Sequence, residues 1–537
     1  MNTGSQPVLS KGEVESIEDI IKNLESGETP PGYDWLPEML RRLAWNKRFN
    51  RRNFVNIHPT PHVPSVLAST LVSLQNPNNI VKAVSGPTTE MEEECIRWLA
   101  QHLLGFDQSR AWGNVVSGGT IANLTALMVA RDYCYRKLSR PRPADVRQRG
   151  LFGLPSGVVM ATAGSHYSIK KALWLLGIGD ENVVTVPVSF DERVALRADR
   201  DRQFIAGVTK RDWRRRICRA LDEDEARGID EMGRFYAGKS KPFSLQPLNS
   251  EIFKSLYGCF EYGTPLLAYV FTLGTTDTGT IESPDLEALD HLAEEDIFIH
   301  ADAAAGGFAL QHTRVAERVI GMDKAHSATL DGHKFGHLAY PNGAIVFREK
   351  GWVYEILHEA PYLQNLAPTL EGSRPGSHVA ALWAAIEDLG KTGRYGRWLD
   401  RIFVFVDALV ECFEASKYFQ VLHDVHLSTV AVAPVPTGKE SRTELNRFVV
   451  RMGDAISNDD TEDAFLVNVD RGLSGIKVRN SNRPPSTPGS GFEDDPLVDL
   501  FCLRIVATNP AVERTDASKL VDYLEGKLEA ARAQGGR

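Results

Sequence analysis

The sequence predicts an α/β fold in which a mostly parallel β-sheet is covered by helices on both faces. Apolar segments typical of strands alternate with helical segments over residues 112–350. The strand segments are nearly continuous apolar runs, such as LLAYVFTL at 266–273, and this pattern is typical of strands buried on both faces. Turns rich in glycine, serine and threonine follow several of these runs, at the sheet edge where open α/β proteins bind ligands.

The chain is expected to have three parts. Residues 1–84 are predicted to be an N-terminal helical and arm segment, whose stretch NIHPTPHVP at 56–64 cannot be regular helix because of its prolines. Residues 85–395 are predicted to be a large α/β domain with a charged insertion at about 190–250. Residues 396–537 are predicted to form a small α+β domain, with strand-like runs at 419–434 and 499–508.

Hydrophobic patterns place the individual elements in the large domain. In chain order, we expect strands at 115–116, 157–161, 183–188, 266–273, 297–301 and 344–347. We expect helices at about 85–104, 121–133, 165–176, 285–295 and 379–389.

Composition and charge exclude several classes of protein. Of 537 residues, 42% are hydrophobic and 24% charged, which is ordinary for a globular protein. The formal net charge of −9 gives no reason to expect nucleic acid, and the basic stretch at 210–219 is interpreted as a solvated helix face. No signal peptide or membrane-length apolar run is expected, so no membrane partner is predicted. The six cysteines form no CxxC or Cys/His cluster, which predicts no metal site and a reducing, cytoplasmic location.

Four segments of the core carry side chains suited to one kind of cofactor. The turn SGGT at 117–120 precedes a helix and can bind phosphate through free backbone N–H groups. His166 follows a strand and can stack on a flat ring. Asp302 ends an apolar strand, where a buried carboxylate can keep a pyridine nitrogen protonated. Lys334, in DGHKFG, is placed as Schiff-base lysines need to be, near a strand end among apolar residues.

Together these segments predict a pyridoxal phosphate site. Taken singly, the turn, the aspartate and the lysine are more often a plain turn, a helix cap and a surface lysine, and the histidine is as often a structural histidine. Their order is mutually consistent, and Asp302 and Lys334 are 334 − 302 = 32 residues apart, about one βαβ step. Lys334 would bind the cofactor aldehyde and Asp302 its ring nitrogen. The absence of GxGxxG and P-loop patterns argues against dinucleotides and nucleoside triphosphates.

At these residues the chain resembles the group II pyridoxal-phosphate-dependent amino acid decarboxylases, which have fold type I, the aspartate aminotransferase-like fold. The resemblance rests on SGGTIAN at 117–123, SHYSIKKA at 165–172, GTTDTGTIE at 274–282, HADAAAGG at 300–307 and LDGHKFG at 330–336. It implies a mostly parallel seven-stranded sheet, pyridoxal 5'-phosphate as cofactor, and a homodimer with its active site at the subunit interface. The segments SLQNPNNI, APYL and TLEGSRPG are similar to the bacterial tyrosine decarboxylase branch.

The resemblance also implies roles for single residues. Around the ring, it assigns the covalent amine to Lys334, the pyridine nitrogen to Asp302, and the two ring faces to Ala304 and His166. At the phosphate, it implies Gly119 and Thr120, with Asp331 and Thr275 nearby. On the substrate side, it implies His333 for the cofactor or substrate carboxylate, His58 near the entrance, and Tyr362 as the loop tyrosine that returns a proton to the α-carbon. The chain departs from the family's common proline and aromatic residue at Gly332 and Ala305.

The predicted function is α-decarboxylation of an L-amino acid in amino acid metabolism, with a tyrosine-like aromatic side chain favoured. Apolar residues near the motifs support that choice: Phe54, Trp112, Phe335 and Tyr362. A glutamate- or aspartate-like substrate stays open, because Arg374 or Arg504 could pair with its second carboxylate. Further alternatives are a carbon–carbon lyase resembling sphingosine-phosphate lyase, a decarboxylating aldehyde synthase, and a non-enzymatic scaffold that has kept the cofactor architecture.

Overall fold

The computed structural model describes most of the chain after residue 51. The described residues are 52–80, 82–138, 146–152, 154, 157–162, 164–186, 265–282, 284, 286–294, 296–352, 369–437, 440–459, 461, 463–471, 477–479 and 497–534, with a few positions between 22 and 42. The predicted insertion at 190–250, the basic stretch at 210–219 and Tyr362 lie outside these residues. Contacts divide the chain into Met1–Asn53 and a second compact unit, Phe54–Arg537, which contains the three β-sheets of the described residues apart from one residue of the first strand.

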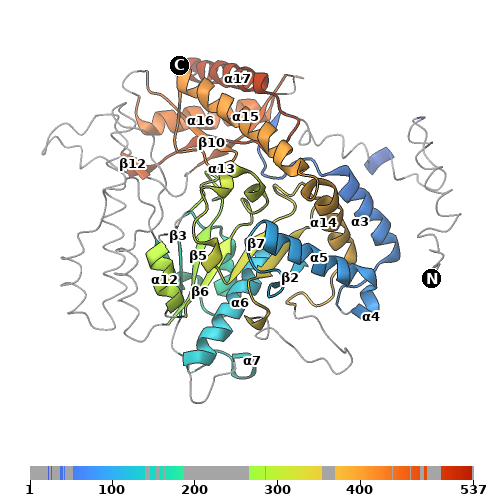
Figure 1. The fold of residues 1–537 in the computed structure, drawn as a ribbon. Helices are drawn as coiled ribbons and strands as arrows, with labels where there is room; N and C mark the ends of the chain where they lie inside the picture. The colour runs from blue at the N-terminus through green and yellow to red at the C-terminus, as the bar shows by residue number, and fades with distance from the viewer. Residues whose placement is uncertain are drawn as a thin grey trace, which may run out of the picture. The chain divides into compact units, whose positions relative to one another are not determined.

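The large sheet has seven strands in the order β2-β8-β7-β6-β5-β3-β4 (Figure 1). Its strands are β2 (Trp112–Val116), β3 (Val158–Thr162), β4 (Val183–Val186), β5 (Leu266–Thr272), β6 (Phe298–Asp302), β7 (Ser327–Leu330) and β8 (Gly343–Phe347). The pairs β3–β4, β3–β5, β5–β6 and β6–β7 are parallel. Strand β8 runs antiparallel to both of its neighbours, β2 and β7. The predicted mostly parallel, seven-stranded sheet is therefore confirmed.

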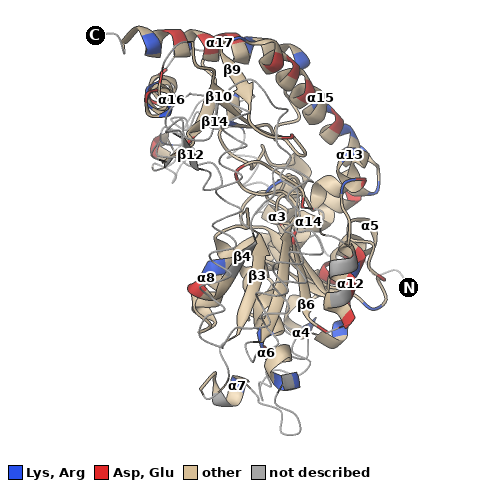
Figure 2. Cartoon of the chain, turned by 90° about the vertical axis from the view of Figure 1, so that its left-hand side faces the viewer, with Lys and Arg blue, Asp and Glu red and all other residues tan. Residues whose placement is uncertain are grey.

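Side chains of successive residues in these strands enter two separate cores. In β6, Ile299 and Ala301 join one buried cluster, whereas Phe298 joins the other, and Tyr269 and Val270 of β5 divide in the same way. This is the alternation that a pleated strand imposes. In Figure 2 the strands of this sheet are almost entirely free of charged residues, as expected of strands covered on both faces.

Helices cover the two faces of the sheet. The first face packs on α6 (Gly119–Leu138) and α8 (Ser168–Leu175), with the short α7 (Val146–Arg149) beside them. The other face packs on α5 (Pro87–His102) and α12 (Leu286–Glu294). The predicted strand–helix alternation is present, with boundaries that differ by a few residues.

A second sheet belongs to the C-terminal part of the unit. Its order is β1-β11-β14-β10-β9, and the pairs β10–β14, β10–β9 and β11–β14 are antiparallel. The strands are β1 (Asn53–Phe54), β9 (Phe419–Val421), β10 (Thr429–Pro434), β11 (Leu466–Asp470) and β14 (Cys502–Val506), with a separate pair β12 (Lys477–Arg479) and β13 (Leu497–Asp499). Helices α15 (Arg394–Ala415), α16 (Arg442–Ser457) and α17 (Arg514–Ala533) lie at this end of the unit (Figures 1 and 2). The division into domains at 84 and 395 stays a prediction.

Several local features explain where helices begin. Helix α16 starts with a capping box, in which Ser441 and Glu444 accept each other's backbone N–H groups. Helix α3 (Val63–Gln75) is not expected from the sequence, because the prolines before it indicate irregular structure. Its own proline, Pro64, falls in the first turn, where a missing N–H costs nothing. The remaining described helices are α4 (Lys82–Ser85), α13 (Thr313–Ala316) and α14 (Gly376–Ala385). No helix in the described part of the chain has the length and apolar character needed to cross a membrane.

Candidate active site

The predicted site segments meet at one edge of the large sheet. Strands β2, β3, β5, β6 and β7 all run in the same direction, so their carboxyl ends share that edge. The segment 117–120 follows β2, His166 follows β3, residues 302–305 end β6, and residues 331–334 follow β7. Segments up to about 217 residues apart in the chain, counted as 334 − 117, are thus brought together by the sheet order.

Two adjoining cavities lie at this edge, and they share His166, Ala304 and Lys334. The first cavity, of about 190 Å³, is also lined by Val55, Asn56, Ile57, His58, Thr272, Gly274, Thr276, Asp302, Ala305, Thr429, Arg504 and Val506. The second cavity, of about 330 Å³, is also lined by Ser117, Gly118, Gly119, Thr120, Ile121, Asn123, Tyr167, Asp331, His333 and Tyr340. Asp302, at the end of β6, therefore lines the first cavity and the turn at 117–120 lines the second, whereas Lys334 lines both.

The Asp302 carboxylate is held by a buried polar network. Nδ2 of Asn123, on the second turn of α6, donates to Oδ2 of Asp302 at 2.9 Å and also to Oγ of Ser168. Oδ1 of Asn123 accepts from Nε2 of His300 and from the Thr329 hydroxyl. Burial lowers the pKa of His300 to about 4, so its imidazole is neutral. Its Nε2 carries the hydrogen that it donates in the hydrogen bond to Oδ1 of Asn123. The network fixes the position of the carboxylate with respect to α6.

A second group of polar side chains follows β7. Nζ of Lys334 lies 3.0 Å from Oδ2 of Asp331, and Nε2 of His333 lies 3.5 Å from the same oxygen. Tyr340 stacks on His333 with 3.8 Å between ring centroids, and the ring of His58 meets Tyr340 edge-on at 5.3 Å. The aromatic series His58, Tyr340, His333 thus connects the lining of the first cavity to that of the second.

Burial sets the charge of two histidines in the cavities. It is the largest cause of a lowered pKa for His166, partly offset by the nearby Asp302 carboxylate. It likewise lowers the pKa of His333, with Asp331 acting in the opposite direction. Both imidazoles are therefore neutral at neutral pH, which suits stacking on a ring and donation or acceptance of a single hydrogen bond.

Two glycines have positions that a side chain would fill. A Cβ on Gly119 would lie 2.9 Å from Oδ2 of Asp331 and 3.2 Å from the Ala304 methyl group, so the turn allows backbone access only without a side chain. A Cβ on Gly332 would lie 2.4 Å from Oδ1 of Asn342 and 2.7 Å from Cδ1 of Leu338. The departure at position 332 from the common proline is therefore explained by the close approach of Asn342.

The structure brings most of the predicted site residues together. His58 and Asp302 line the first cavity, Gly119, Thr120, Asp331 and His333 line the second, and His166, Ala304 and Lys334 line both. Thr275 is not among the described lining residues of either cavity. It is buried, its hydroxyl lies 2.8 Å from that of Thr278, and its Oγ1 accepts from the backbone N–H of Thr280. Its neighbour Thr276 lines the first cavity instead.

Three of the four aromatic residues that favoured an aromatic substrate, Phe54, Trp112 and Phe335, lie elsewhere. Phe54 is buried and stacks on Phe405 with 5.2 Å between centroids, and Phe335 is also buried in the core. Trp112 packs against Phe347 in the sheet. None of these three belongs to the described lining of either cavity.

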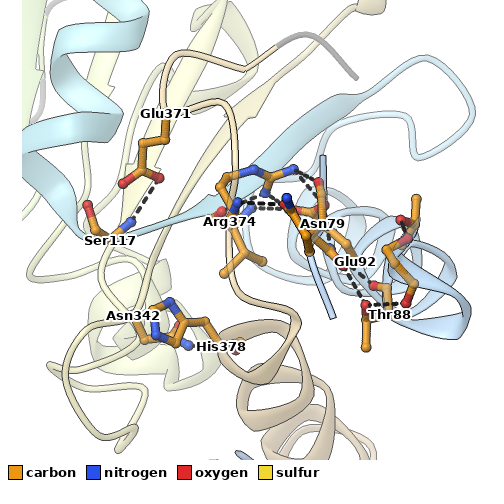
Figure 3. A network of polar contacts seen from close by, with 12 residues as sticks. Asn79, Thr88, Glu92, Ser117, Asn342, Glu371, Arg374 and His378 are labelled. Carbon is orange, nitrogen blue, oxygen red and sulfur yellow. Dashed lines mark hydrogen bonds and ion pairs between the residues drawn. The ribbon is translucent and has the colours of Figure 1, made fainter. Parts of the chain in front are cut away.

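The two arginines considered for an acidic substrate have different environments. Arg374 is buried and forms an ion pair with Glu92, and its guanidinium also donates to the carbonyl groups of Asn79 and Val115 (Figure 3). Arg504 lines the first cavity, where Nη1 donates to the carbonyl of Thr276 at 2.7 Å. Its buried Nε has no partner among the described residues. Only Arg504 is placed to meet a ligand in this cavity.

Sequence reasoning gave no role to Asn123, Tyr340 or Tyr167. A signal was present for Asn123, which follows Thr120 by three residues and so lies one helical turn beyond the phosphate turn. No comparable pattern marks Tyr340, whose ring reaches His333 from the connection between β7 and β8.

These residues fit a phosphorylated pyridine aldehyde. A turn with two glycines opens helix α6 and lines the second cavity. A buried carboxylate, held by Asn123, lines the first cavity. The Lys334 amine lines both cavities, with the small Ala304 and the flat His166 beside it. Fold and site together define a lysine-dependent pyridoxal phosphate enzyme of the α/β class.

Comparison with known families leads to the same class. Residues 47–212 and 248–433 match the model described as the pyridoxal-dependent decarboxylase conserved domain. The chain belongs to the pyridoxal-dependent decarboxylase family. This confirms the family and the cofactor predicted from the sequence motifs.

Curated relatives carry several substrate names. The chain is 26% identical over 338 residues to a tryptophan decarboxylase of Clostridium sporogenes, covering 61% of this chain and 64% of that protein. It is 26% identical over 427 residues to an L-tyrosine decarboxylase of Enterococcus faecium, covering 70% and 64%. It is 27% identical over 340 residues to an aspartate 1-decarboxylase of Aliivibrio fischeri, covering 59% and 51%. The chain thus spans between about half and just under two thirds of the length of these relatives.

Solved structures confirm the fold. The crystal structure of Oryza sativa TDC with PLP and tryptamine has a TM-score of 0.69 at 16% identity, covering 98% of this chain and 99% of that one. The glutamate decarboxylase domain of a Vibrio parahaemolyticus protein has a TM-score of 0.64 at 17% identity, covering 99% and 87%. The fold type I architecture predicted from the sequence is therefore confirmed.

Proposed function

We propose that this protein is a pyridoxal 5'-phosphate-dependent decarboxylase that removes the α-carboxylate of an L-amino acid and releases the amine and carbon dioxide. The observation that carries the proposal is that Lys334 and Asp302 line one cavity, with His166 and Ala304 beside them. An amine and a fixed carboxylate in one small cavity are the two groups that this cofactor requires.

The chain's own residues hold and orient the reacting groups. When bound, pyridoxal 5'-phosphate supplies an aldehyde that joins amines covalently and a protonated ring that accepts electrons from the α-carbon. Lys334 provides the amine for that aldehyde. Asp302, held by Asn123, keeps the proton on the ring nitrogen through a charge-assisted hydrogen bond. Gly119 and Thr120 offer the turn at the start of α6 to the phosphate.

The substrate side of the site belongs to the first cavity. His58 lines it beside Ile57, where it can contact the amino acid. We retain Tyr362 as the group that returns a proton to the α-carbon after carbon dioxide leaves. Neutral His166 lines both cavities beside Lys334, where its imidazole can stack on the cofactor ring.

One assay tests the reaction. The cofactor-loaded protein is incubated separately with each of the twenty amino acids, and carbon dioxide, amine and aldehyde are measured. We expect carbon dioxide and amine in equal amounts from one substrate or a few. Aldehyde with ammonia in place of amine would instead identify an aldehyde synthase, and carbon–carbon cleavage without carbon dioxide a lyase.

The Asp302→Ala variant tests the assigned role of the carboxylate. It should still bind the cofactor aldehyde through Lys334 but lose most of its turnover, because the ring is no longer held in its protonated form. The charge-matched control is replacement of Asp400 by alanine. Asp400 is an exposed residue on α15 that pairs with His312 and lines neither cavity among the described residues. Parent-rate decarboxylation by Asp302→Ala would contradict the assignment.

Two substrate classes remain in the proposal. An aromatic or aliphatic side chain is supported by Val55, Ile57 and Val506, which give the first cavity an apolar wall, and by the branch resemblance. An acidic side chain is supported by Arg504, whose Nε is buried and without a partner among the described residues. The amino acid panel distinguishes the two classes directly.

We also propose a homodimer with the active site near the subunit interface. Support comes from apolar side chains exposed on α3: Val63 at 75%, Val66 at 40%, Leu67 at 59% and Leu74 at 52%. Exposed apolar residues gathered on one helix are typical of a covered surface. On α8, Trp174 and Leu175 are exposed in the same way, close in sequence to the cavity residue Tyr167.

Sedimentation of the holoenzyme tests the assembly. We expect twice the mass of the chain, and a shift to the monomer in a Leu67→Glu, Leu74→Glu double variant. Val404→Glu, at an exposed apolar position on α15, is the matched control and should stay dimeric. A monomeric parent protein would refute the dimer. The predicted cytoplasmic location belongs to the same proposal and is tested by cell fractionation.

A further inference from the structure

The imidazole of His166 is held at one of its two ring nitrogens. Its Nδ1 lies 2.8 Å from Oγ of Ser168, and the backbone N–H of Ser168 donates to the same nitrogen at 3.3 Å. The other nitrogen, Nε2, has no hydrogen-bond partner among the described residues. Because His166 lines both cavities, Nε2 is the ring nitrogen left to meet a ligand.

The hydroxyl of Ser168 has only one direction in which it can donate. Ser168 is the first residue of α8 and is fully buried. Its Oγ accepts from Nδ2 of Asn123 at 2.9 Å, since an amide nitrogen only donates. The orientation of that amide is set at both ends, because Nδ2 also donates to Asp302 and Oδ1 accepts from the Thr329 hydroxyl. The hydroxyl hydrogen of Ser168 is therefore left for Nδ1 of His166.

The opposite arrangement, with a proton on Nδ1, conflicts with two contacts. The ring N–H would face the backbone N–H of Ser168, and two donors would meet with no acceptor between them. The Ser168 hydroxyl would accept from both of its neighbours, and its own hydrogen would be buried without an acceptor. The neutral ring of His166 carries one proton, so that proton belongs on Nε2.

We propose that Ser168 is a positioning residue that fixes His166 as the tautomer with its proton on Nε2, so that the imidazole presents a hydrogen-bond donor to the cavities. The ligand group that meets this nitrogen must then be an acceptor, such as an oxygen atom. His166 cannot take a proton from a substrate at Nδ1, because that nitrogen is already occupied by the two donors of Ser168. Its chemical role is restricted to donation.

One amide nitrogen connects this histidine to the carboxylate proposed for the cofactor ring. Nδ2 of Asn123 gives one hydrogen to Asp302 and the other to Ser168, and Ser168 in turn donates to His166. The group proposed for the ring nitrogen and the group proposed for the ring face therefore share one support on α6. A hydrogen-bonded chain of this kind fixes the positions and the proton of its members together.

Nitrogen-15 spectroscopy of the full-length, histidine-labelled protein shows which ring nitrogen carries the proton. The chain has 14 histidines, so the signals of His166 are identified as those that His166→Gln removes. We expect an unprotonated Nδ1 and a protonated Nε2, both before and after pyridoxal 5'-phosphate is added. A proton on Nδ1 of the parent protein, or equal occupancy of the two nitrogens, would overturn the proposal, whether or not any serine variant folds.

Two serine variants separate this positioning role from a general loss of packing. Ser168→Ala leaves only the longer contact from the backbone N–H, so the proton should spread over both nitrogens and the two signals of His166 should move toward each other. Ser327→Ala is the matched control, because Ser327 is equally buried and its hydroxyl lies 2.8 Å from Nδ1 of a different histidine, His300. It should change the signals of His300 and leave those of His166 as in the parent protein. Unchanged His166 signals in Ser168→Ala, or an equal change in Ser327→Ala, would refute the role of Ser168.

The inference rests on the proposed function only for the ligand that the donor serves. The tautomer is measured in the protein before any cofactor or substrate is added. A protein with the proton on Nε2 that forms no amine from any amino acid refutes the proposed function alone. A protein that decarboxylates an amino acid while its His166 carries the proton on Nδ1 refutes the inference alone.

Discussion

Replacement of Asn123 by alanine should damage both the stability and the cofactor affinity of the protein. The side chain is 1% exposed and forms hydrogen bonds through both ends of its amide. Its Nδ2 donates to the Asp302 carboxylate, and its Oδ1 accepts from His300 and from the Thr329 hydroxyl. Alanine removes all of these partners at once and puts nothing polar in their place.

The loss of stability comes from the donors left behind. Each buried donor without an acceptor costs about 1–3 kcal/mol, and His300 and Thr329 would become two such donors. The free energy of unfolding should therefore fall by about 2–5 kcal/mol, allowing for some rotation of the Thr329 hydroxyl. Asp302 would lose a hydrogen bond to a charged group, which is worth about 1.5–3 kcal/mol, so cofactor affinity should fall by about 10- to 100-fold.

Urea unfolding of the apoprotein and equilibrium titration with pyridoxal 5'-phosphate measure the two effects separately. Asn458→Ala, an exposed asparagine at the end of α16, is the matched control, and its effect on both quantities should be small. An Asn123→Ala variant that unfolds at the same urea concentration and binds the cofactor as tightly as the parent would refute the role assigned to the network.

Four further predictions concern charge and packing. Arg504→Met should reduce kcat/KM for acidic amino acids alone if these are substrates, and a panel of amino acid substrates measures this change. Arg374→Met should lower the free energy of unfolding by about 3–5 kcal/mol, because it leaves the Glu92 charge buried and unpaired, and urea unfolding measures this loss. Burial raises the pKa of Glu282 from 4.5 to about 7, so the folded protein binds the proton of Glu282 more tightly than the unfolded chain does. The contribution of Glu282 to stability should therefore be fully present below pH 4.5 and be lost as the pH rises through about 7. That loss is about 3 kcal/mol and should be absent from a pH series of urea unfolding of Glu282→Gln. Gly332→Ala should destabilise the protein by about 1–3 kcal/mol in thermal unfolding, and the same substitution at the open position Gly351 should have little effect.

The sequence predicted the sheet and the central pair of the site for one physical reason. Parallel strands buried on both faces are long apolar runs, and the turns after their carboxyl ends must lie at one edge of the sheet. Asp302 and Lys334 could therefore be placed together from the order of the strands alone. The same reasoning brought His166 and the turn at 117–120 to that edge, because each comes after a strand that runs in the same direction.

Contacts between distant segments could not be predicted in this way. Arg374 and Glu92 are separated by 282 residues and meet because α5 and the segment before α14 lie side by side. A lone arginine in a sequence does not reveal a buried carboxylate partner so far away. Such packing also determines why Arg504 lines a cavity and Arg374 does not. It likewise places Phe54 and Phe335 in the core and not at the site.

The two cavities differ in how much of the chain must exist before each can form. Every described lining residue of the second cavity lies between Ser117 and Tyr340. The first cavity also needs Thr429, Arg504 and Val506, the last two from β14, the final strand of the chain among the described residues. The turn after β2 reaches its place only once β8 joins β2 to β7, so during synthesis on the ribosome the phosphate side of the site can assemble when Phe347 is made. That is about 159 residues, counted as 506 − 347, before the wall that faces the substrate is complete. A nascent chain can gain a place for the cofactor well before it can enclose an amino acid.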